Sequence, residues 1–125
     1  DKLKLEGFYI WVDNLDEAIA FYEQVFQRKI VNREKDRWAD FGTVDGANLF
    51  GIYNYTVDGD ECKVGNNVTP EVRTTDAAKE WGRIAALNPK SISEIIVLEQ
   101  PALYKYFQFE DAWGNTWEVT EHYYD

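Results

Sequence analysis

The chain has 125 residues, of which 45% are hydrophobic and 16% aromatic, and 13 basic against 23 acidic side chains give a formal net charge of −10. A chain of this length forms one domain and buries roughly two-thirds of the surface that it exposes when unfolded. The negative charge repels phosphate backbones and anionic lipid headgroups, which argues against nucleic acid and membrane partners. It favours a cationic ligand, although an acidic surface that only keeps the protein soluble has the same composition.

The chain has a single cysteine, Cys62, which can form no internal disulfide, and no segment resembles a signal peptide or a membrane span. A reducing cytoplasm is therefore the expected location. Cys62 lies in a polar stretch without a neighbouring histidine, and no serine stands in a Gly-x-Ser-x-Gly turn. A glycine-rich phosphate loop is also absent, so the sequence indicates neither nucleophilic catalysis nor a phosphate-binding loop.

The first half of the chain predicts a strand, a helix and three more strands. The β-forming residues of 5–12 end at Asp13 and Asn14, where Asn14 can cap a helix and Glu17 completes a capping box. Apolar residues then recur at helical spacing on one face: Leu15, Ala18, Ile19, Tyr22, Val25 and Phe26. Strand-like stretches follow at 28–33, 37–43 and 47–53.

The second half predicts the same order after a polar connection. Residues 56–65 lack the ligand pattern of a calcium loop and are interpreted as a solvated linker. A strand at 67–73 leads to a helix capped by Thr74 or Thr75 and ended by Asn88 and Pro89. The apolar face of this helix carries Ala77, Ala78, Trp81, Ile84 and Ala85. Three strands follow at 93–98, 103–110 and 116–122, the last two joined by the turn at 111–115.

The two halves also share a sequence repeat. Val12, Asn14, Asp16, Ala18 and Phe21 become, sixty positions later, Val72, Thr74, Asp76, Ala78 and Trp81. With a further shift of eight, Trp38 and Phe41 fall on Tyr106 and Phe109. The sequence therefore predicts an α+β fold of two βαβββ modules within one domain, residues 1–125. The modules span about 3–54 and about 66–123, with a linker at about 55–65.

This order, with the helix motif VDNLDEAIAFYEQVF at 12–26 and the turn FEDAWGNTWEV at 109–119, resembles the vicinal oxygen chelate superfamily. That superfamily includes glyoxalase I, ring-cleaving dioxygenases, fosfomycin-resistance enzymes and bleomycin-resistance proteins. The resemblance covers nearly the whole chain. It implies two curved sheets around a cleft, which single-domain members commonly share between the two chains of a homodimer.

Metal-using members of the superfamily take ligands from the first and last strands of each module, usually His and Glu. By that resemblance the first-strand positions here are Gly7 and Asn67, neither of which can replace an imidazole. The last-strand positions are Glu118 and a residue near Phe50. His122 lies four residues after Glu118, roughly 13 Å along a strand, so the two cannot chelate one ion. We therefore expect no metal and no other cofactor.

Side-chain alternation along the first strand places Tyr9 and Trp11 on the face of Gly7, and Phe8, Ile10 and Val12 towards the helix. Asn67, Thr69 and Glu71 are the equivalents on the first strand of the second module. For each aromatic residue, ordinary core packing is the alternative interpretation; for the set, a flat or cationic ligand is indicated. The candidate ligand-binding residues are Tyr9, Trp11, Trp38, Phe50, Asn67, Glu71, Tyr106, Trp113 and Glu118.

Three functions remain open at this point. The leading hypothesis is a metal-free protein that sequesters a small aromatic or cationic compound in a cleft at a dimer interface. The second is a lyase, isomerase or dioxygenase of the same superfamily, with a metal anchored by Glu118 and by residues outside the expected positions. The third is a dimeric regulatory domain that binds no small molecule. Metal-free catalysis with Glu118 as a general base is also left open by the sequence.

Overall fold

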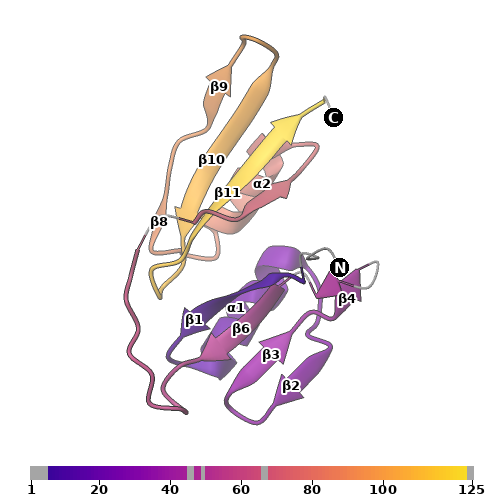
Figure 1. Ribbon diagram of the computed structural model, residues 1–125. Coiled ribbons are helices and arrows are strands. Elements are labelled where there is room, and N and C mark those ends of the chain that lie inside the picture. The colour runs from indigo at the N-terminus through magenta and orange to yellow at the C-terminus, as the bar shows by residue number, and fades with distance from the viewer. Residues whose placement is uncertain (1–5, 45–46, 49, 66–67, 124–125) are drawn as a thin grey trace, which may run out of the picture. The chain divides into compact units, whose positions relative to one another are not determined.

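The computed structural model describes residues 6–44, 47–48, 50–65 and 68–123. The chain divides into two compact units, Asp1–Lys63 and Val64–Asp125 (Figure 1). Each unit combines one helix with a mixed sheet, so the predicted α+β class is confirmed. Neither helix among these residues is long and apolar enough to cross a membrane.

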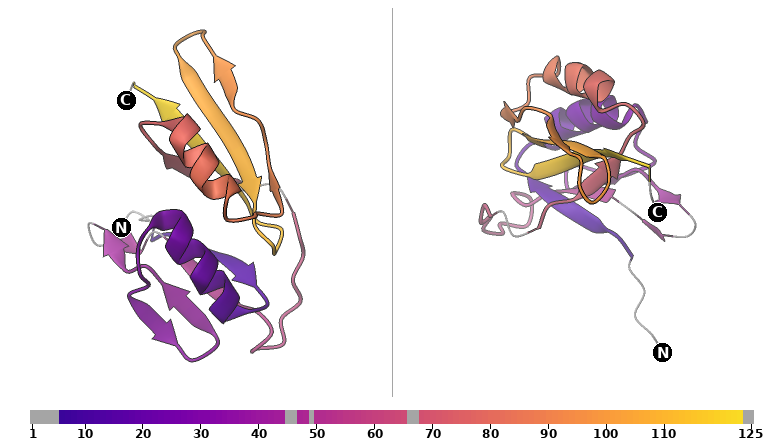
Figure 2. Two further views of the ribbon diagram at one scale, coloured as in Figure 1. Left: turned by 180° about the vertical axis from the view of Figure 1, so that it is seen from behind. Right: turned by 90° about the horizontal axis from the view of Figure 1, so that it is seen from above.

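The first unit has a four-stranded sheet in the order β1-β6-β3-β2, in which β1 and β6 are parallel and the other neighbours antiparallel. The helix α1 covers one face of this sheet (Figure 2). The elements of the first unit are β1 (Phe8–Val12), α1 (Leu15–Phe26), β2 (Asn32–Glu34), β3 (Trp38–Asp40), β4 (Thr43–Val44), β5 (Ala47–Asn48) and β6 (Phe50–Asn54). β4 and β5 pair only with each other, as a separate hairpin.

The core of the first unit lies between α1 and the sheet. The predicted helix begins where expected, because the Asn14 side chain accepts a hydrogen bond from the Glu17 amide at 3.1 Å. Its predicted stripe is buried, apart from the half-buried Phe26. Gln27 ends the helix in a left-handed conformation, and regular pairing with β3 starts only at Asn32. The strand predicted at 28–33 therefore begins four residues late.

The second unit has the corresponding order β7-β11-β10-β8, in which β7 and β11 are parallel. The strand β9 also pairs with β10, next to β8 along the same edge. The elements of the second unit are β7 (Glu71–Arg73), α2 (Ala77–Ala85), β8 (Ser91–Ile92), β9 (Ile96–Leu98), β10 (Tyr104–Glu110) and β11 (Thr116–His122). The last two strands match their predicted positions closely. The strand predicted at 67–73 is shorter, since Pro70 has no amide hydrogen for the ladder.

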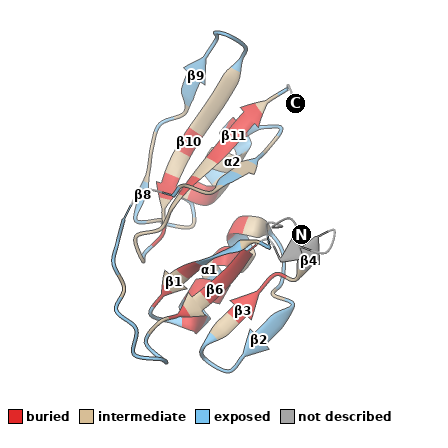
Figure 3. Cartoon of the chain, in the orientation of Figure 1, coloured by how far each residue is buried: buried red, intermediate tan, exposed pale blue. Residues whose placement is uncertain are grey.

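The helix of the second unit corrects three predictions. Its cap is Asp76, which accepts from the Lys79 amide at 3.1 Å, and not Thr74 or Thr75. Ala78 of the predicted apolar face is exposed, while Ala77 and Ile84 are buried. The α2 ribbon accordingly carries both the buried and the exposed colour (Figure 3). α2 also ends at Ala85, before the predicted Asn88 and Pro89.

The internal repeat is visible in the packing of the two units. Phe41 and Phe50 stack with centroids 5.6 Å apart and planes at 8°, and Phe109 and Trp117 stack at 6.5 Å and 5°. Phe41 directly follows β3 and Phe50 lies on β6, whereas Phe109 lies on β10 and Trp117 on β11. In the strand orders of the two sheets, β3 corresponds to β10 and β6 corresponds to β11. The predicted match of Phe41 with Phe109 agrees with this packing. The cap residues of the two helices, Asn14 and Asp76, are 62 positions apart, whereas the sequence repeat was aligned with an offset of sixty.

Candidate functional site

The sheet of the first unit carries a set of rings on the side away from α1, which we call the aromatic face. Its members are Tyr9, Trp11, Trp38, Tyr53 and Tyr55. Tyr9 contacts Trp38 edge to face at 5.4 Å and Tyr53 at 5.9 Å, and Trp11 contacts Tyr53 at 5.2 Å. Tyr9 is 51% exposed, so part of this surface is open to a ligand.

A glycine makes room for the largest ring of this face. A Cβ atom at Gly51 would overlap the indole of Trp38, which therefore lies directly over the Gly51 backbone. The indole Nε1 donates to Asp40 Oδ2 at 2.8 Å, and Asp40 also accepts from the Gly42 amide at 2.8 Å and from Asn32 Nδ2. Asp40 is buried and thus fixes the indole in one orientation.

Acidic side chains border the aromatic face. The Tyr53 hydroxyl donates towards Asp60 Oδ2 at 2.5 Å and Asp58 Oδ2 at 2.8 Å, and Arg37 pairs with Asp58 at 3.0 Å. The hydrogen bond to Asp60 is the largest cause of a raised Tyr53 pKa, so this phenol stays neutral. An open cavity of about 350 Å³ adjoins Trp11 and is also lined by Glu61, Cys62 and Lys63.

The sheet of the second unit carries a polar group on its open face, which we call the carboxylate cluster: Glu71, Glu118, Tyr104 and Gln108. Glu118 lies in register between Glu71 on β7 and Gln108 on β10. The Tyr104 hydroxyl donates to Glu118 Oε2 at 3.1 Å, and Gln108 Nε2 donates to Glu118 Oε1 at 3.1 Å. Burial, followed by the hydrogen bond and charge of Glu118, raises the pKa of Tyr104 to about 12.

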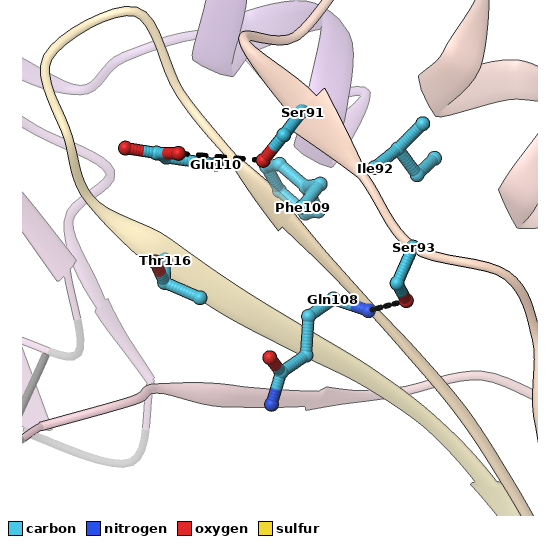
Figure 4. A pocket seen from close by; sticks show the side chains of 7 residues that line it. All are labelled: Ser91, Ile92, Ser93, Gln108, Phe109, Glu110 and Thr116. Atoms are coloured by element: carbon cyan, nitrogen blue, oxygen red, sulfur yellow. Dashed lines mark hydrogen bonds between the residues drawn. The ribbon is translucent and has the colours of Figure 1, made fainter.

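Aromatic side chains continue this open face along β10 and β11. Tyr104 stacks on His122 with centroids 5.6 Å apart and planes at 9°, and lies 5.8 Å from Tyr106. A cavity of about 290 Å³ lies at the β8–β10 edge of the same sheet (Figure 4). The residues that line it are Ser91, Ile92, Ser93, Gln108, Phe109, Glu110 and Thr116.

The charge of the carboxylate cluster has no cationic partner among the described residues. Neither Glu71 nor Glu118 forms an ion pair with a lysine or arginine there. Glu110 on the same sheet is different, because it pairs with Lys90 at 3.5 Å. Two adjacent carboxylates on neighbouring strands repel each other, so this position favours a positively charged group.

The structure separates the predicted site residues into groups. Tyr9, Trp11 and Trp38 come together on the aromatic face, while Glu71, Glu118 and Tyr106 lie on the open face of the second unit. Trp113 lies half-buried in the Asp111–Asn115 turn, where its amide donates to Asp111 Oδ1 at 2.9 Å. Asn67 lies outside the described residues.

Phe50 requires a correction. It is only 7% exposed and contacts Tyr22 at 5.3 Å and Phe26 at 5.4 Å, so it belongs to the core under α1. The ring of β6 that faces the open side is Tyr53, three residues later and of opposite parity. Sequence analysis also missed Tyr55, Tyr104 and Gln108. Alternation along 104–110 was the signal that could have placed Tyr104 and Gln108 on the face of Tyr106.

The side chains around Glu118 do not fit a transition metal. Tyr104 and Gln108 reach the carboxylate through an O–H and an N–H, and a protonated phenol and an amide are weak ligands for a transition metal. Within the described part of the chain, His, Cys, Asp and Glu form no group of three or more that could hold an ion. The arrangement instead suits recognition of an organic group by rings and by carboxylate oxygens.

The family model of the Glyoxalase/Bleomycin resistance protein/Dioxygenase superfamily matches residues 4–119. No curated protein matches the chain. Among solved structures, a lactoylglutathione lyase from Agrobacterium tumefaciens is 18% identical, with a TM-score of 0.68 over 97% of this chain and 95% of that chain. A bleomycin-binding protein complexed with bleomycin is 14% identical, with a TM-score of 0.67 over 97% and 100%. A glyoxalase/bleomycin resistance protein from Albidiferax ferrireducens T118 is 12% identical, with a TM-score of 0.73 over 94% and 98%.

Proposed function

Because the chain belongs to the Glyoxalase/Bleomycin resistance protein/Dioxygenase superfamily, we propose that it is a metal-free protein that binds and sequesters a small aromatic or cationic compound. The aromatic face is the observation that carries this proposal. Its rings are arranged around the partly exposed Tyr9, and the buried Asp40 holds one of them, Trp38, in place. Such a preformed surface binds a planar molecule with little loss of side-chain freedom.

The energetics favour a planar cation over a neutral compound. Each ring that stacks on a ligand or faces its charge contributes roughly 0.5 to 2 kcal/mol. The chain's net charge of −10 attracts a cation over a longer range. In the second unit, Glu71 and Glu118 form a separate position that attracts a positive group.

The proposal includes a homodimer with the binding cleft at its interface. Its support is the superfamily membership, since single-domain members commonly build their clefts from two chains. One solved relative in the fold comparison is described as complexed with bleomycin. Sedimentation equilibrium at micromolar protein concentration tests this part separately: a mass near twice 14.6 kDa supports it, and a monomer mass contradicts it.

Tryptophan fluorescence tests the binding function. Planar organic cations such as protonated aminoquinolines should quench the protein at micromolar concentration, and their uncharged analogues should bind more weakly. Trp11→Leu should remove most of this binding. Trp113→Leu is the matched control, because Trp113 lies in the Asp111–Asn115 turn and contributes no ring to the aromatic face. No quenching by any member of a broad panel, or equal losses in both variants, contradicts the proposal.

A second candidate is a metal-dependent lyase, isomerase or dioxygenase. The observation in its favour is Glu118, which lies on the last strand of its unit beside Glu71. Elemental analysis of protein purified without chelators separates the two candidates. Stoichiometric zinc, nickel, manganese or iron that is lost in Glu118→Gln supports the second candidate and contradicts the metal-free proposal.

A further inference from the structure

A β-bulge interrupts the edge of the second sheet beside the carboxylate cluster. Ile92 pairs with Phe109 and Ile96 pairs with Tyr106, so residues 93–95 on one side face only residues 107–108 on β10. The strand predicted at 93–98 is accordingly reduced to β9 at Ile96–Leu98, and β8 at Ser91–Ile92 lies before the predicted range. Bulges are over-represented beside functional sites, where they change the direction of a side chain.

Ser93 replaces the hydrogen bonds that the bulge removes from the ladder. Its amide donates to the Gln108 carbonyl at 2.8 Å, and its hydroxyl accepts from the Gln108 amide at 2.9 Å (Figure 4). Trp81 of α2 donates from Nε1 to the Ser93 carbonyl at 2.8 Å. One residue, itself tied to the helix, therefore holds both backbone groups of Gln108.

The Gln108 side chain transmits this fixed position to Glu118. The two residues lie directly opposite each other on β10 and β11, and Gln108 Nε2 donates to Glu118 Oε1. Tyr104 donates to the other oxygen, Oε2. Each carboxylate oxygen thus has one neutral donor and keeps acceptor capacity for a second. Neutral donors set the direction of the carboxylate and leave its negative charge in place. A lysine or arginine partner would cancel that charge.

We propose that Gln108 is the positioning residue that holds Glu118 ready for a ligand, and that the Ser93 bulge holds Gln108. The ligand group that fits Glu118 is a protonated amine, because it combines positive charge with N–H donors and can also reach the adjacent Glu71. This inference rests on the proposed binding function and names the ligand chemistry at this position. Gln108 acts through Glu118, so its substitution should alter discrimination between charged and neutral ligands.

Side-chain amide NMR tests the positioning without any ligand. In the full-length protein, an amide proton of Gln108 should be shifted downfield and exchange slowly, because it is bonded to a carboxylate. Ser93→Ala should move this signal towards that of a free glutamine. Ser91→Ala is the matched control, because Ser91 lines the same cavity but bonds Glu110. An unchanged Gln108 signal in Ser93→Ala, with the fold intact by circular dichroism, overturns the role of the bulge.

A pair of probes tests the ligand chemistry: phenethylamine, which is protonated at pH 7, and its neutral analogue 2-phenylethanol. The wild type should prefer the amine, and Gln108→Met, which keeps the side-chain length but removes the amide, should reduce that preference about tenfold. Affinity for 2-phenylethanol should be unchanged. Thr116→Val, in the same cavity, should retain the preference.

The outcomes of the probe experiment are distinct. If the amine binds and Gln108→Met keeps the full preference, the positioning role of Gln108 is overturned while the binding function stands. If neither probe binds the wild type, at millimolar concentration and by NMR, the protonated-amine chemistry is overturned. The wider binding function then depends on the planar cations tested with Trp11→Leu.

Discussion

The indole of Trp38 lies over the backbone of Gly51, at a point where any larger residue would overlap it. In the second unit the corresponding place on the last strand is occupied by Glu118, which is half-buried and accepts hydrogen bonds from Tyr104 and Gln108. The correspondence follows from the stacked pairs Phe41–Phe50 and Phe109–Trp117, because Phe50 directly precedes Gly51 and Trp117 directly precedes Glu118. One unit therefore presents rings where the other presents a carboxylate.

Gly51→Ala should destabilise the first unit. The new methyl group must displace an indole that Asp40 holds through Nε1, and overpacking of this kind costs about 1–3 kcal/mol. Urea unfolding followed by tryptophan fluorescence measures the loss. Gly82→Ala is the control: Gly82 lies inside α2 with nothing within 4 Å of a new Cβ, so it should stabilise by about 0.5–1 kcal/mol. A loss in the control or no loss at Gly51 contradicts the packing described.

Glu118→Gln should lower the pKa of Tyr104 from about 12 towards its ordinary value of 10.0. Burial of Tyr104 remains in the variant, but the negative charge that opposes the phenolate is removed. NMR titration of protein labelled at the tyrosine Cζ follows this phenol directly. Glu110→Gln removes the same charge from β10 without contact to Tyr104 and should leave its titration unchanged.

The raised pKa of Tyr104 also affects stability. Because the folded state binds the phenolic proton more tightly than the unfolded state, its contribution is complete below pH 10.0 and is lost as pH rises towards about 12. The wild type should therefore lose more unfolding free energy than Glu118→Gln across this range. Equal losses would show that Glu118 does not oppose ionisation of this phenol.

Glu121→Gln should weaken the attachment of α2 to its sheet. The buried Glu121 carboxylate accepts from the Ala77 amide at 2.7 Å and from Tyr123 at 2.6 Å, and these bonds lower its pKa. Removing the charged acceptor should cost about 1–3 kcal/mol at pH 7. Since the folded-state pKa is lowered, this contribution is present above pH 4.5 and is lost as pH falls through the folded value. The difference from wild type should shrink on acidification, whereas the exposed Glu94→Gln should show little difference at any pH.

Asp76→Ala should destabilise α2 by about 1 kcal/mol, because the orphan Lys79 amide loses its acceptor. Thr75→Ala should change stability by less than about 0.5 kcal/mol, since the Thr75 side chain forms no hydrogen bond with the first turn of α2 in the described part of the chain. Thermal unfolding of the two variants at pH 7 provides the comparison. A larger loss of stability in Thr75→Ala than in Asp76→Ala would show that Thr75, one of the two caps predicted from the sequence, caps α2.

The difference between the two helix starts shows what the sequence can and cannot predict. α1 begins at Asn14, where the capping residue and the apolar stripe agree locally. Before α2, three consecutive residues can all act as caps, and the choice depends on distant contacts. Thr74 still donates to the Thr120 carbonyl as part of the sheet, and Glu121 of β11 accepts from Ala77. No local pattern contains that information.

The candidate site shows the same division. Alternation along β1 correctly placed Tyr9 and Trp11 on one face, because both lie on one short strand. The side on which Phe50 points depends on how many residues connect β3 to β6, so an error of one residue reverses it. The positioning of Gln108 depends on the bulge at Ser93, where one additional residue on the neighbouring strand shifts the register.

The near-parallel ring pairs have a consequence for how this chain can be redesigned. Each half keeps its pair on the side covered by its helix, so the rings and carboxylates of the other side can be exchanged as sets, provided that Gly51 and Asp40 move together with Trp38. Transplanting uncovered residues between corresponding strands should yield chimaeras with two ring-lined halves or two carboxylate-lined halves. The chimaera with two ring-lined halves should then prefer flat ligands, and the chimaera with two carboxylate-lined halves should prefer positively charged ligands.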